Sequence, residues 1–288
     1  MNLVVFIMKS IKEQVEYLRD FVVDEKNALF DRLIQERTDY VTVVLEDLFQ
    51  SHNQSAVMRS ADCYGIQHVH LIENRNSYDM TSTVSQGARD WLSIHRHKEL
   101  ENNTQATIDQ LRAEGYRILA TTPHANDIFV DDIDLEKGKM AFFFGTELTG
   151  LSDLVIGQAD EFVKIPMYGF TESLNVSVCA AITMYSVTRR LRGSGIDWHL
   201  SDRAKDEILF KWYKNAIKAS GKEGIIGVGF DKSDAIMGLI DDGYLLCTMA
   251  QNPDVMGYEG VKAAVAAIGG ESLGGKVTDT GVSVLTAG

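Results

Sequence analysis

The 288-residue sequence has few cysteines and no hydrophobic run long enough to span a membrane. Its three cysteines, Cys63, Cys179 and Cys247, lack metal-ligand spacing and lie in apolar stretches, which predicts buried, reduced thiols. The apolar residues 1–10 have no positively charged segment and no small-residue cleavage site, unlike a secretion signal. We therefore expect a cytoplasmic protein with no membrane segment and no metal site.

Positive charge is also scarce, because 28 lysines and arginines face 41 acidic residues and give a formal net charge of −13. This balance argues against a broadly basic nucleic-acid-binding protein, although a local basic face is enough to contact phosphates. Internal repeats, low-complexity tracts and the Gly-x-Gly-x-x-Gly signature of dinucleotide-binding folds are absent. The content of 45% hydrophobic and 24% charged residues is typical of a soluble globular chain.

Short apolar runs alternate with helical patterns between residues 40 and 192, which predicts an α/β fold with a mostly parallel sheet. The runs are apolar on both faces, as expected of strands that helices cover on both sides. We expect strands at 41–45, 68–72, 117–121, 139–144 and 162–165, and helices at 53–64, 109–114 and 174–191.

Four segments follow from these patterns. Residues 1–38 form a helical N-terminal extension with about two helices, 39–193 the α/β domain, 194–220 a C-terminal helix, and 221–288 a small α/β tail. The tail holds 14 of the 24 glycines, a shift in composition that places a boundary near residue 220. Its pattern predicts strands at 225–230, 244–250 and 282–286 and helices at 233–240 and 253–268.

Three short blocks carry the chemistry that the sequence suggests. They are Asn-Gln-Ser-Ala-Val-Met-Arg at 53–59, Phe-Gly-Thr-Glu-Leu-Thr-Gly at 144–150 and Ser-Leu-Asn-Val-Ser-Val at 173–178. Taken singly, each has a plain structural interpretation. Asn53 or Ser173 caps a helix, Arg59 is a surface charge and Glu147 is a carboxylate in a turn.

In this order the blocks resemble the signature motifs of the SpoU/TrmH family of RNA ribose 2′-O-methyltransferases, part of the SPOUT superfamily, over residues 40–192. The resemblance implies S-adenosylmethionine as cofactor, a homodimer and a C-terminal trefoil knot, which no pattern in the sequence shows. The flanking helices resemble those of members that methylate a guanosine in the tRNA D-loop. Ribosomal RNA as substrate, and a knotted protein that binds RNA or cofactor without turnover, are the alternatives.

The resemblance also implies roles for single residues. Asn53, Arg59, Ser173 and Asn175 are the expected catalytic residues, and the expected cofactor-binding residues are Thr121, Thr122, Gly145, Glu147, Gly150, Ile165, Met167 and Leu174. A guanidinium is almost never neutral, so we expect Arg59 to hold a phosphate and stabilise the developing alkoxide instead of acting as a free base.

Contacts to tRNA or ribosomal RNA are expected from local clusters of basic residues. One cluster is His95-Arg-His-Lys98 with Arg89 nearby, and the other comprises Arg189, Arg190 and Arg192 at the end of a predicted helix. The second cluster has a structural alternative, because cations near a helix C-terminus complement the helix dipole. We expect Arg89, Arg189, Arg190 and Arg192 to bind RNA.

The tail resembles a different family, the periplasmic sugar-binding proteins, of which it would be the C-terminal end. The resemblance rests on residues 228–231, 249–252 and 256–262, and it implies sugar contacts at the positions of Asp231 and Gln251. Such proteins bind ligand between two lobes, and most of both lobes is missing here. We expect both residues to be relics or structural, with a sugar-binding module as the alternative function from another class.

Overall fold

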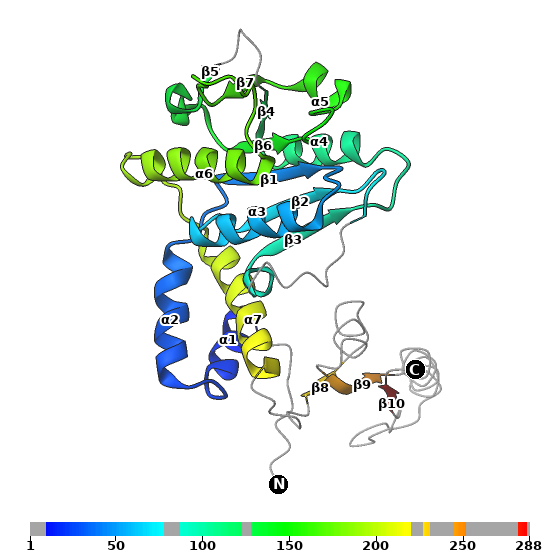
Figure 1. Ribbon diagram of the computed structural model, residues 1–288. Coiled ribbons are helices and arrows are strands. Elements are labelled where there is room, and N and C mark those ends of the chain that lie inside the picture. Colours follow the sequence, from blue (N-terminus) through cyan, green and yellow to red (C-terminus); the bar gives the residue numbers. More distant parts are fainter. Residues whose placement is uncertain are drawn as a thin grey trace, which may run out of the picture. The chain divides into compact units, whose positions relative to one another are not determined.

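The computed structural model describes residues 10–77, 87–122 and 128–219, together with three short strands beyond residue 220 (Figure 1). The chain forms two compact units. The larger is Leu18–Asn215, and the smaller combines Met1–Tyr17 with Ala216–Gly288. Within the described ranges, no helix is long and apolar enough to cross a membrane.

A seven-stranded sheet forms the centre of the larger unit, with the strand order β3-β2-β1-β6-β4-β7-β5. The strands are β1 (Val41–Glu46), β2 (His68–Ile72), β3 (Ser93–His97), β4 (Arg117–Thr121), β5 (Ile128–Phe129), β6 (Met140–Phe144) and β7 (Glu161–Lys164). Every strand pair described in this sheet is parallel. The predicted α/β fold with a mostly parallel sheet is therefore confirmed.

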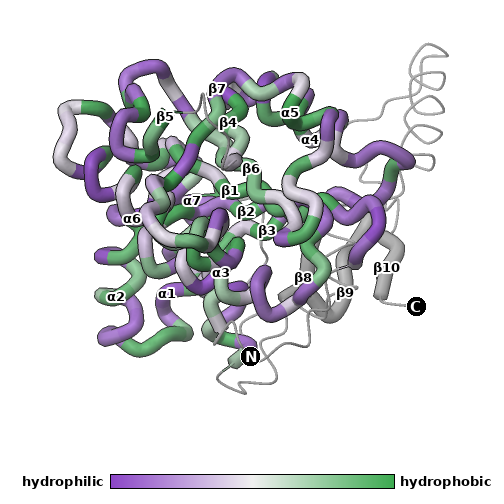
Figure 2. Tube along the Cα trace, turned by 45° about the horizontal axis from the view of Figure 1, so that its top comes forward, coloured by the Kyte–Doolittle hydropathy of each residue, from purple (hydrophilic) through white to green (hydrophobic). Residues whose placement is uncertain are grey.

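Helices cover both faces of the sheet. α3 (Ser51–Cys63) and α6 (Val176–Arg192) pack on one face, and α4 (Asn103–Ala113) and α5 (Asp153–Gln158) pack on the other. On β6, Phe142 and Phe144 join the α3–α6 side and Phe143 joins the α4–α5 side, since successive side chains of a strand alternate in direction. Figure 2 shows the resulting hydrophobic strands at the centre and hydrophilic segments toward the periphery.

The helices expected near the ends of the α/β domain are present as α1 (Ile11–Arg19), α2 (Asp24–Gln35) and α7 (Asp202–Ala219). An aromatic cluster joins α2 and α7 to the segment after the 3-10 helix Ala88–Asp90. The Phe30 ring lies 5.1 Å from that of Tyr213 and 5.5 Å from that of Trp212. The Trp212 indole also donates a hydrogen bond to the Trp91 carbonyl oxygen at 2.8 Å.

Three elements of the sheet layer were not expected. β3 is a polar strand at the edge of the sheet, β5 has two residues, and α5 has six. None of the three carries an apolar run long enough to stand out in the sequence. Two further 3-10 helices, Val130–Asp132 and Leu135–Lys137, connect β5 to β6.

The three described strands of the tail lie within two residues of the expected positions. β8 (Gly227–Phe230) is parallel to β9 (Leu245–Gln251), and β10 (Val282–Thr286) is antiparallel to β9. Gln251 ends β9, whereas Asp231 and the two expected tail helices lie outside the described residues.

The cysteines differ from expectation at Cys63, which is exposed near the C-terminus of α3. Cys179 is half-buried, and burial raises the pKa of its thiol to about 11. The side chain of Cys247, in β9, is outside the described residues. The expectation of a buried thiol was therefore wrong for Cys63, because the apolar residues around it in the sequence face the other side of the helix.

Candidate active site

The three sequence blocks meet at the carboxyl-terminal edge of the central strands, where ligands bind in open α/β sheets. The first block follows β1, the second follows β6, and the third follows β7 at the start of α6. Because β1, β6, β4 and β7 are neighbours in the sheet, these loops come together. They border an open cavity of about 540 Å³, lined by Phe49, Gln50, Thr146, Glu147, Leu148, Ser173, Leu174 and Asn175.

Asn53 connects all three blocks. Its side chain is 2% exposed, and its amide nitrogen donates hydrogen bonds to the Glu147 carboxylate and, at 3.1 Å, to the Gln50 side chain. Its amide oxygen accepts a hydrogen bond of 3.2 Å from the side chain of Asn175. α3 begins at Ser51, so Asn53 lies inside the first turn and does not cap the helix.

The loop after β6 is closed at its base. Thr146 and Gly150 exchange two backbone hydrogen bonds of 3.1 and 3.0 Å. A Cβ atom on Gly145 would lie 2.2 Å from the carbonyl carbon of Gly150, so the close approach requires glycine. Gly150 has a φ of +70°, which also favours glycine. The loop therefore presents Glu147 and Leu148 to the cavity from a narrow base.

The start of α6 is capped by Asn175, and not by Ser173 as the plain interpretation of the third block had it. The Asn175 side-chain oxygen accepts hydrogen bonds from the Ser177 amide at 2.9 Å and from the Ser177 hydroxyl at 2.6 Å. This leaves Ser173, which is exposed, free of a capping role at the cavity. Asn175 thus caps the helix with one atom and holds Asn53 with the other.

The remaining cofactor candidates lie outside the cavity lining. The Thr121 hydroxyl donates to the Phe143 carbonyl oxygen at 2.8 Å, and the Thr122 amide donates to Val163 at 3.0 Å, so both stabilise the sheet edge. Ile165 packs against the α3–α6 core, and Met167 is exposed beyond β7. Cofactor contact by these four residues stays a prediction.

Arg59 lies on the exposed side of α3, six residues after Asn53. At 100° per residue this spacing turns the two side chains about 120° apart and separates them by about 9 Å along the axis. Arg59 makes no hydrogen bond or ion pair within the described part of the chain, so its guanidinium is available to a ligand. The fold thus separates Arg59 from the network that joins Asn53 to Glu147.

The arginines predicted to bind RNA fall into two groups. Arg190 donates to the carbonyl oxygens of Val130 and Ile133, at 3.2 and 2.6 Å. Arg192 pairs with the Glu36 carboxylate and lies 4.6 Å from the Trp198 ring. Arg89 is half-buried and 3.9 Å from Asp90. These three arginines already contact protein.

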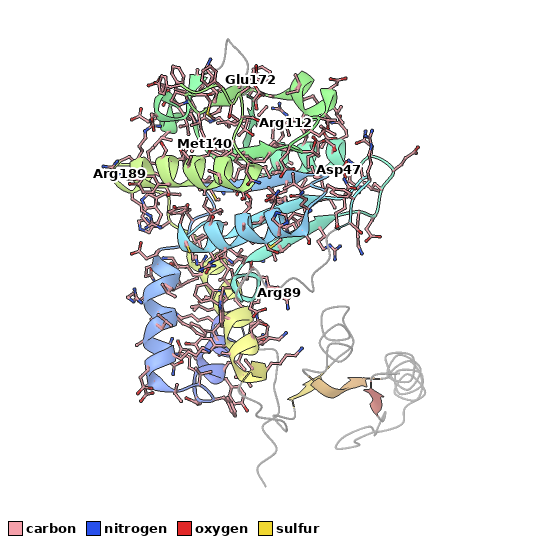
Figure 3. All side chains as sticks on the ribbon, viewed as in Figure 1. Asp47, Arg89, Arg112, Met140, Glu172 and Arg189 are labelled. Atoms are coloured by element: carbon pink, nitrogen blue, oxygen red, sulfur yellow. The ribbon has the colours of Figure 1, made fainter. Side chains whose placement is uncertain are left out.

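Arg189, in contrast, is exposed and makes no hydrogen bond or ion pair within the described residues. Figure 3 shows it and Asp47 at opposite ends of the central sheet. Arg189 lies thirteen residues after Val176, the first residue of α6, a distance of about 20 Å along the helix axis. Within one chain, α6 therefore carries Arg189 away from the cavity. Its contact with RNA stays a prediction.

The other basic cluster is strand β3. Its two histidines turn toward β2, where His95 Nε2 lies 2.9 Å from His68 Nδ1 and His97 Nε2 lies 3.0 Å from His70 Nδ1. Arg96 points to the opposite side and makes two hydrogen bonds of 2.7 Å with the Glu73 carboxylate. This segment is part of the sheet and not a free basic patch.

Sequence reasoning missed four residues that line the cavity: Phe49, Gln50, Thr146 and Leu148. Phe49 and Leu148 are 77% and 93% exposed, which is unusual for large apolar side chains. Their positions in the sequence could have identified them, because each follows a strand and lies within a few residues of a predicted site residue. Within the described ranges, no group of three or more His, Cys, Asp or Glu side chains is placed to hold a metal ion.

Comparisons with known proteins agree with this geometry. The SpoU rRNA methylase family model matches residues 40–185. The chain belongs to this family. It is 42% identical over 209 residues to a tRNA (guanosine(18)-2′-O)-methyltransferase of Borreliella burgdorferi, a match that covers 73% of this chain and 94% of the relative.

One further relative is similar in sequence and one solved structure in fold. The Escherichia coli K12 enzyme of the same name is 28% identical, over 67% of this chain and 84% of that protein. The crystal structure of the A. aeolicus TrmH/SpoU tRNA modifying enzyme superposes with a TM-score of 0.57 and 24% identity, over 71% of this chain and 96% of the other. At that identity the superposition shows a shared fold.

Proposed function

We propose that this chain transfers a methyl group from S-adenosylmethionine to the 2′-hydroxyl of a guanosine in the D-loop of tRNA. The observation that carries the proposal is the hydrogen-bonded set Asn53, Glu147 and Asn175, which brings the three family blocks to one cavity. The names of the B. burgdorferi and E. coli relatives support tRNA as the substrate. The family name supports ribosomal RNA as the second candidate.

The cavity is suited to the cofactor. Its volume lies in the range of small-molecule sites, and Gly145 leaves room for the loop to close tightly where a Cβ atom would obstruct it. S-adenosylmethionine supplies an activated methyl group when it is bound. We assign its binding to the loop of Thr146, Glu147 and Leu148, with Leu174 facing it from the start of α6.

The chain's own residues would orient and activate the ribose. Ser173 and Asn175 offer short polar groups at the cavity, suited to hold a hydroxyl in line for transfer. Arg59 is exposed and makes no hydrogen bond or ion pair with any residue that the structure describes. It is proposed to hold the phosphate of the target nucleotide and stabilise the alkoxide, while the proton leaves through phosphate or water. Arg189 is proposed as a further phosphate contact.

The proposal includes a homodimer. Val178, Ile182 and Tyr185 are exposed on α6 at spacings of four and three residues, which forms an apolar stripe on one side of the helix. A second copy of the chain covering this stripe would bury it. The trefoil knot of the family and a cytoplasmic location, where tRNA is modified, belong to the same proposal.

Residues 221–288 are proposed as an appended unit outside the methyltransferase, similar to the C-terminal end of a periplasmic sugar-binding protein but without sugar binding. The proposed divisions are the helical extension at 1–38, the methyltransferase domain at 39–193 and the helix at 194–220. A boundary near residue 220 is supported by the division of the compact units between Asn215 and Ala216. It is also supported by the B. burgdorferi relative, 94% of which is matched by 73% of this chain.

The decisive experiment measures transfer of labelled methyl groups from S-adenosylmethionine to unmodified tRNA and to ribosomal RNA. We expect 2′-O-methylguanosine in the tRNA D-loop after nucleoside mapping. Incorporation only into ribosomal RNA would favour the second candidate. A folded protein that labels neither RNA would defeat the proposal.

The role of Arg59 is tested by Arg59→Ala and Arg59→Lys. Removing one preorganised donor from a developing oxyanion typically costs about 100- to 1,000-fold in rate, so we expect a loss of this size in the alanine variant. The lysine variant should recover part of it, because it restores the charge without the planar fork. Cofactor affinity and melting temperature should stay unchanged in both, and wild-type turnover by Arg59→Ala would contradict the assignment.

A further inference from the structure

Glu46, the last residue of β1, has a buried carboxylate held only by neutral donors. The side chain is 4% exposed, and no ion pair to it occurs within the described residues. One oxygen, Oε2, accepts a hydrogen bond of 2.8 Å from the Ser152 amide. The other, Oε1, accepts from the hydroxyls of Ser152 and Thr104 at 2.7 and 2.8 Å. Three hydrogen bonds thus hold the carboxylate at both of its oxygens.

The partner Ser152 lies directly after the loop that presents Glu147 to the cavity. That loop closes between Thr146 and Gly150, and Gly145 contacts Gly150 so closely that the base of the loop has little freedom. Ser152 follows Gly150 by two residues, and its amide and hydroxyl both bond to Glu46. A displacement of Ser152 would therefore displace the base of the loop.

Glu46 also lies a few residues before the segment after β1 that lines the same cavity. β1 ends at Glu46, and the chain then runs through Phe49 and Gln50, which line the cavity, to Asn53. The carboxylate thus fastens the loop after β6 to the segment after β1. The network that joins Asn53 to Glu147 crosses the same two segments at the cavity itself.

We propose that Glu46 is a positioning residue, which through Ser152 holds the loop after β6 in the form that binds S-adenosylmethionine. The inference rests on the proposed function of the cavity. Glu46 is not among the residues that line the cavity, so it acts on cofactor and ribose only through other residues. It acts by fixing the distance between the two segments that carry Gln50 and Glu147.

The second hydroxyl on Glu46 supplies a matched control. Thr104, in the first turn of α4, donates to the same carboxylate oxygen and accepts from the Asn74 side chain at 2.9 Å, away from the cavity loop. Both Ser152→Ala and Thr104→Val remove one hydroxyl donor from Glu46. Ser152→Ala also removes the N-cap of α5, because the serine hydroxyl accepts from the Val155 amide at 3.3 Å. Glu46→Gln keeps this cap and separates the two effects. Only the serine belongs to the chain segment of the cofactor loop.

The experiment compares full-length Ser152→Ala, Thr104→Val and Glu46→Gln by calorimetric titration with S-adenosylmethionine, well below the lowest melting temperature. We expect Kd to rise about tenfold in Ser152→Ala and Glu46→Gln, the loss that one charged hydrogen bond corresponds to, and to stay within about twofold in Thr104→Val. With saturating cofactor, kcat should remain near wild type in all three.

Two results would overturn the inference alone. One is wild-type affinity in Ser152→Ala and Glu46→Gln, and the other is an equal loss in Thr104→Val, which would make the carboxylate a general structural contact. A wild-type protein that binds no S-adenosylmethionine would overturn the proposed function and the inference with it.

Discussion

At Gly145 a methyl group has no room. The nearest atoms to a Cβ at this position belong to the backbone of Gly150 and Leu151, at 2.2 and 2.3 Å, and backbone cannot rotate away as a side chain can. The closed base of the loop after β6 therefore depends on one hydrogen atom in place of a side chain. This constraint is local to the loop, so we expect a larger side chain at this position to affect cofactor binding more than the fold.

Gly145→Ala should open the base of the loop and weaken S-adenosylmethionine binding. An overpacked contact costs about 1–3 kcal/mol. If this cost falls on the binding-competent form of the loop, Kd rises by about 5- to 150-fold. Gly157→Ala is the matched control, because the Cβ in α5 meets nothing within 4 Å and alanine favours helix. Calorimetric titration checks both, and wild-type affinity in Gly145→Ala would show that the loop adapts.

At the scale of elements, β2 and β3 carry four stacked histidines between them. His70 stacks on His95 with ring centroids 4.5 Å apart, and His68 and His97 extend the stack through their contacts at 5.2 and 5.3 Å. Burial lowers the pKa of His70 to about 2 and that of His95 to about 4, and it lowers the pKa of His68 and His97 as well.

Charged groups around the stack modify these pKa values less than burial does. Glu114 raises the pKa values of His68, His95 and His97, and Asp39 raises that of His68. Lys211 lowers the pKa values of His68 and His95, and Lys139 lowers that of His68. The lowered pKa values keep the rings neutral near pH 7. Each ring-to-ring hydrogen bond needs one nitrogen that carries no proton, and a neutral imidazole supplies it.

These pKa values predict that acid destabilises the protein. Because the folded pKa values lie below the unfolded value of about 6.5, the unfolded chain binds more protons as the pH falls. The contribution of the stack is then fully present above pH about 6.5 and falls as the pH drops, down to pH about 4 for His95 and about 2 for His70. The slope is at most about 1.4 kcal/mol per pH unit for each histidine.

Urea unfolding at several pH values measures this slope. His97→Gln, which cannot titrate, should make the free energy of unfolding less dependent on pH in that window, with His52→Gln as the control for removing an exposed histidine. Equal slopes in wild type and His97→Gln would contradict a contribution from the stack.

At the scale of the whole molecule, part of this chain lies outside its match to the B. burgdorferi relative. The larger unit ends at Asn215, and the B. burgdorferi relative is matched over 94% of its length by 73% of this chain. The described strands of the tail pair with one another in a separate sheet, and none pairs with the seven-stranded sheet.

Deleting residues 221–288 should therefore leave methyl transfer to tRNA within about twofold of the full chain, since no proposed site residue is removed. The truncated and full-length proteins are compared by kcat/KM for tRNA and by melting temperature. A large loss of activity with an unchanged melting temperature would instead assign the tail a role in the reaction.

The sequence by itself determined the sheet, most of its strands and the three blocks, because burial on both faces requires apolar runs that are visible without a structure. The sequence did not predict β3, because a polar edge strand has the same pattern as a basic loop. In the structure its histidines face β2, and its Arg96 pairs with Glu73. Local pattern records backbone conformation and burial, and it does not record partners.

The tertiary structure alone decided which residues meet. Asn53 contacts Glu147 and Asn175 across 94 and 122 residues, because the strand order places β1 beside β6 and near β7. The same order fastens Ser152 to Glu46, and the direction of α6 takes Arg189 away from the cavity. These contacts depend on how distant segments pack, a property that no short stretch of sequence contains.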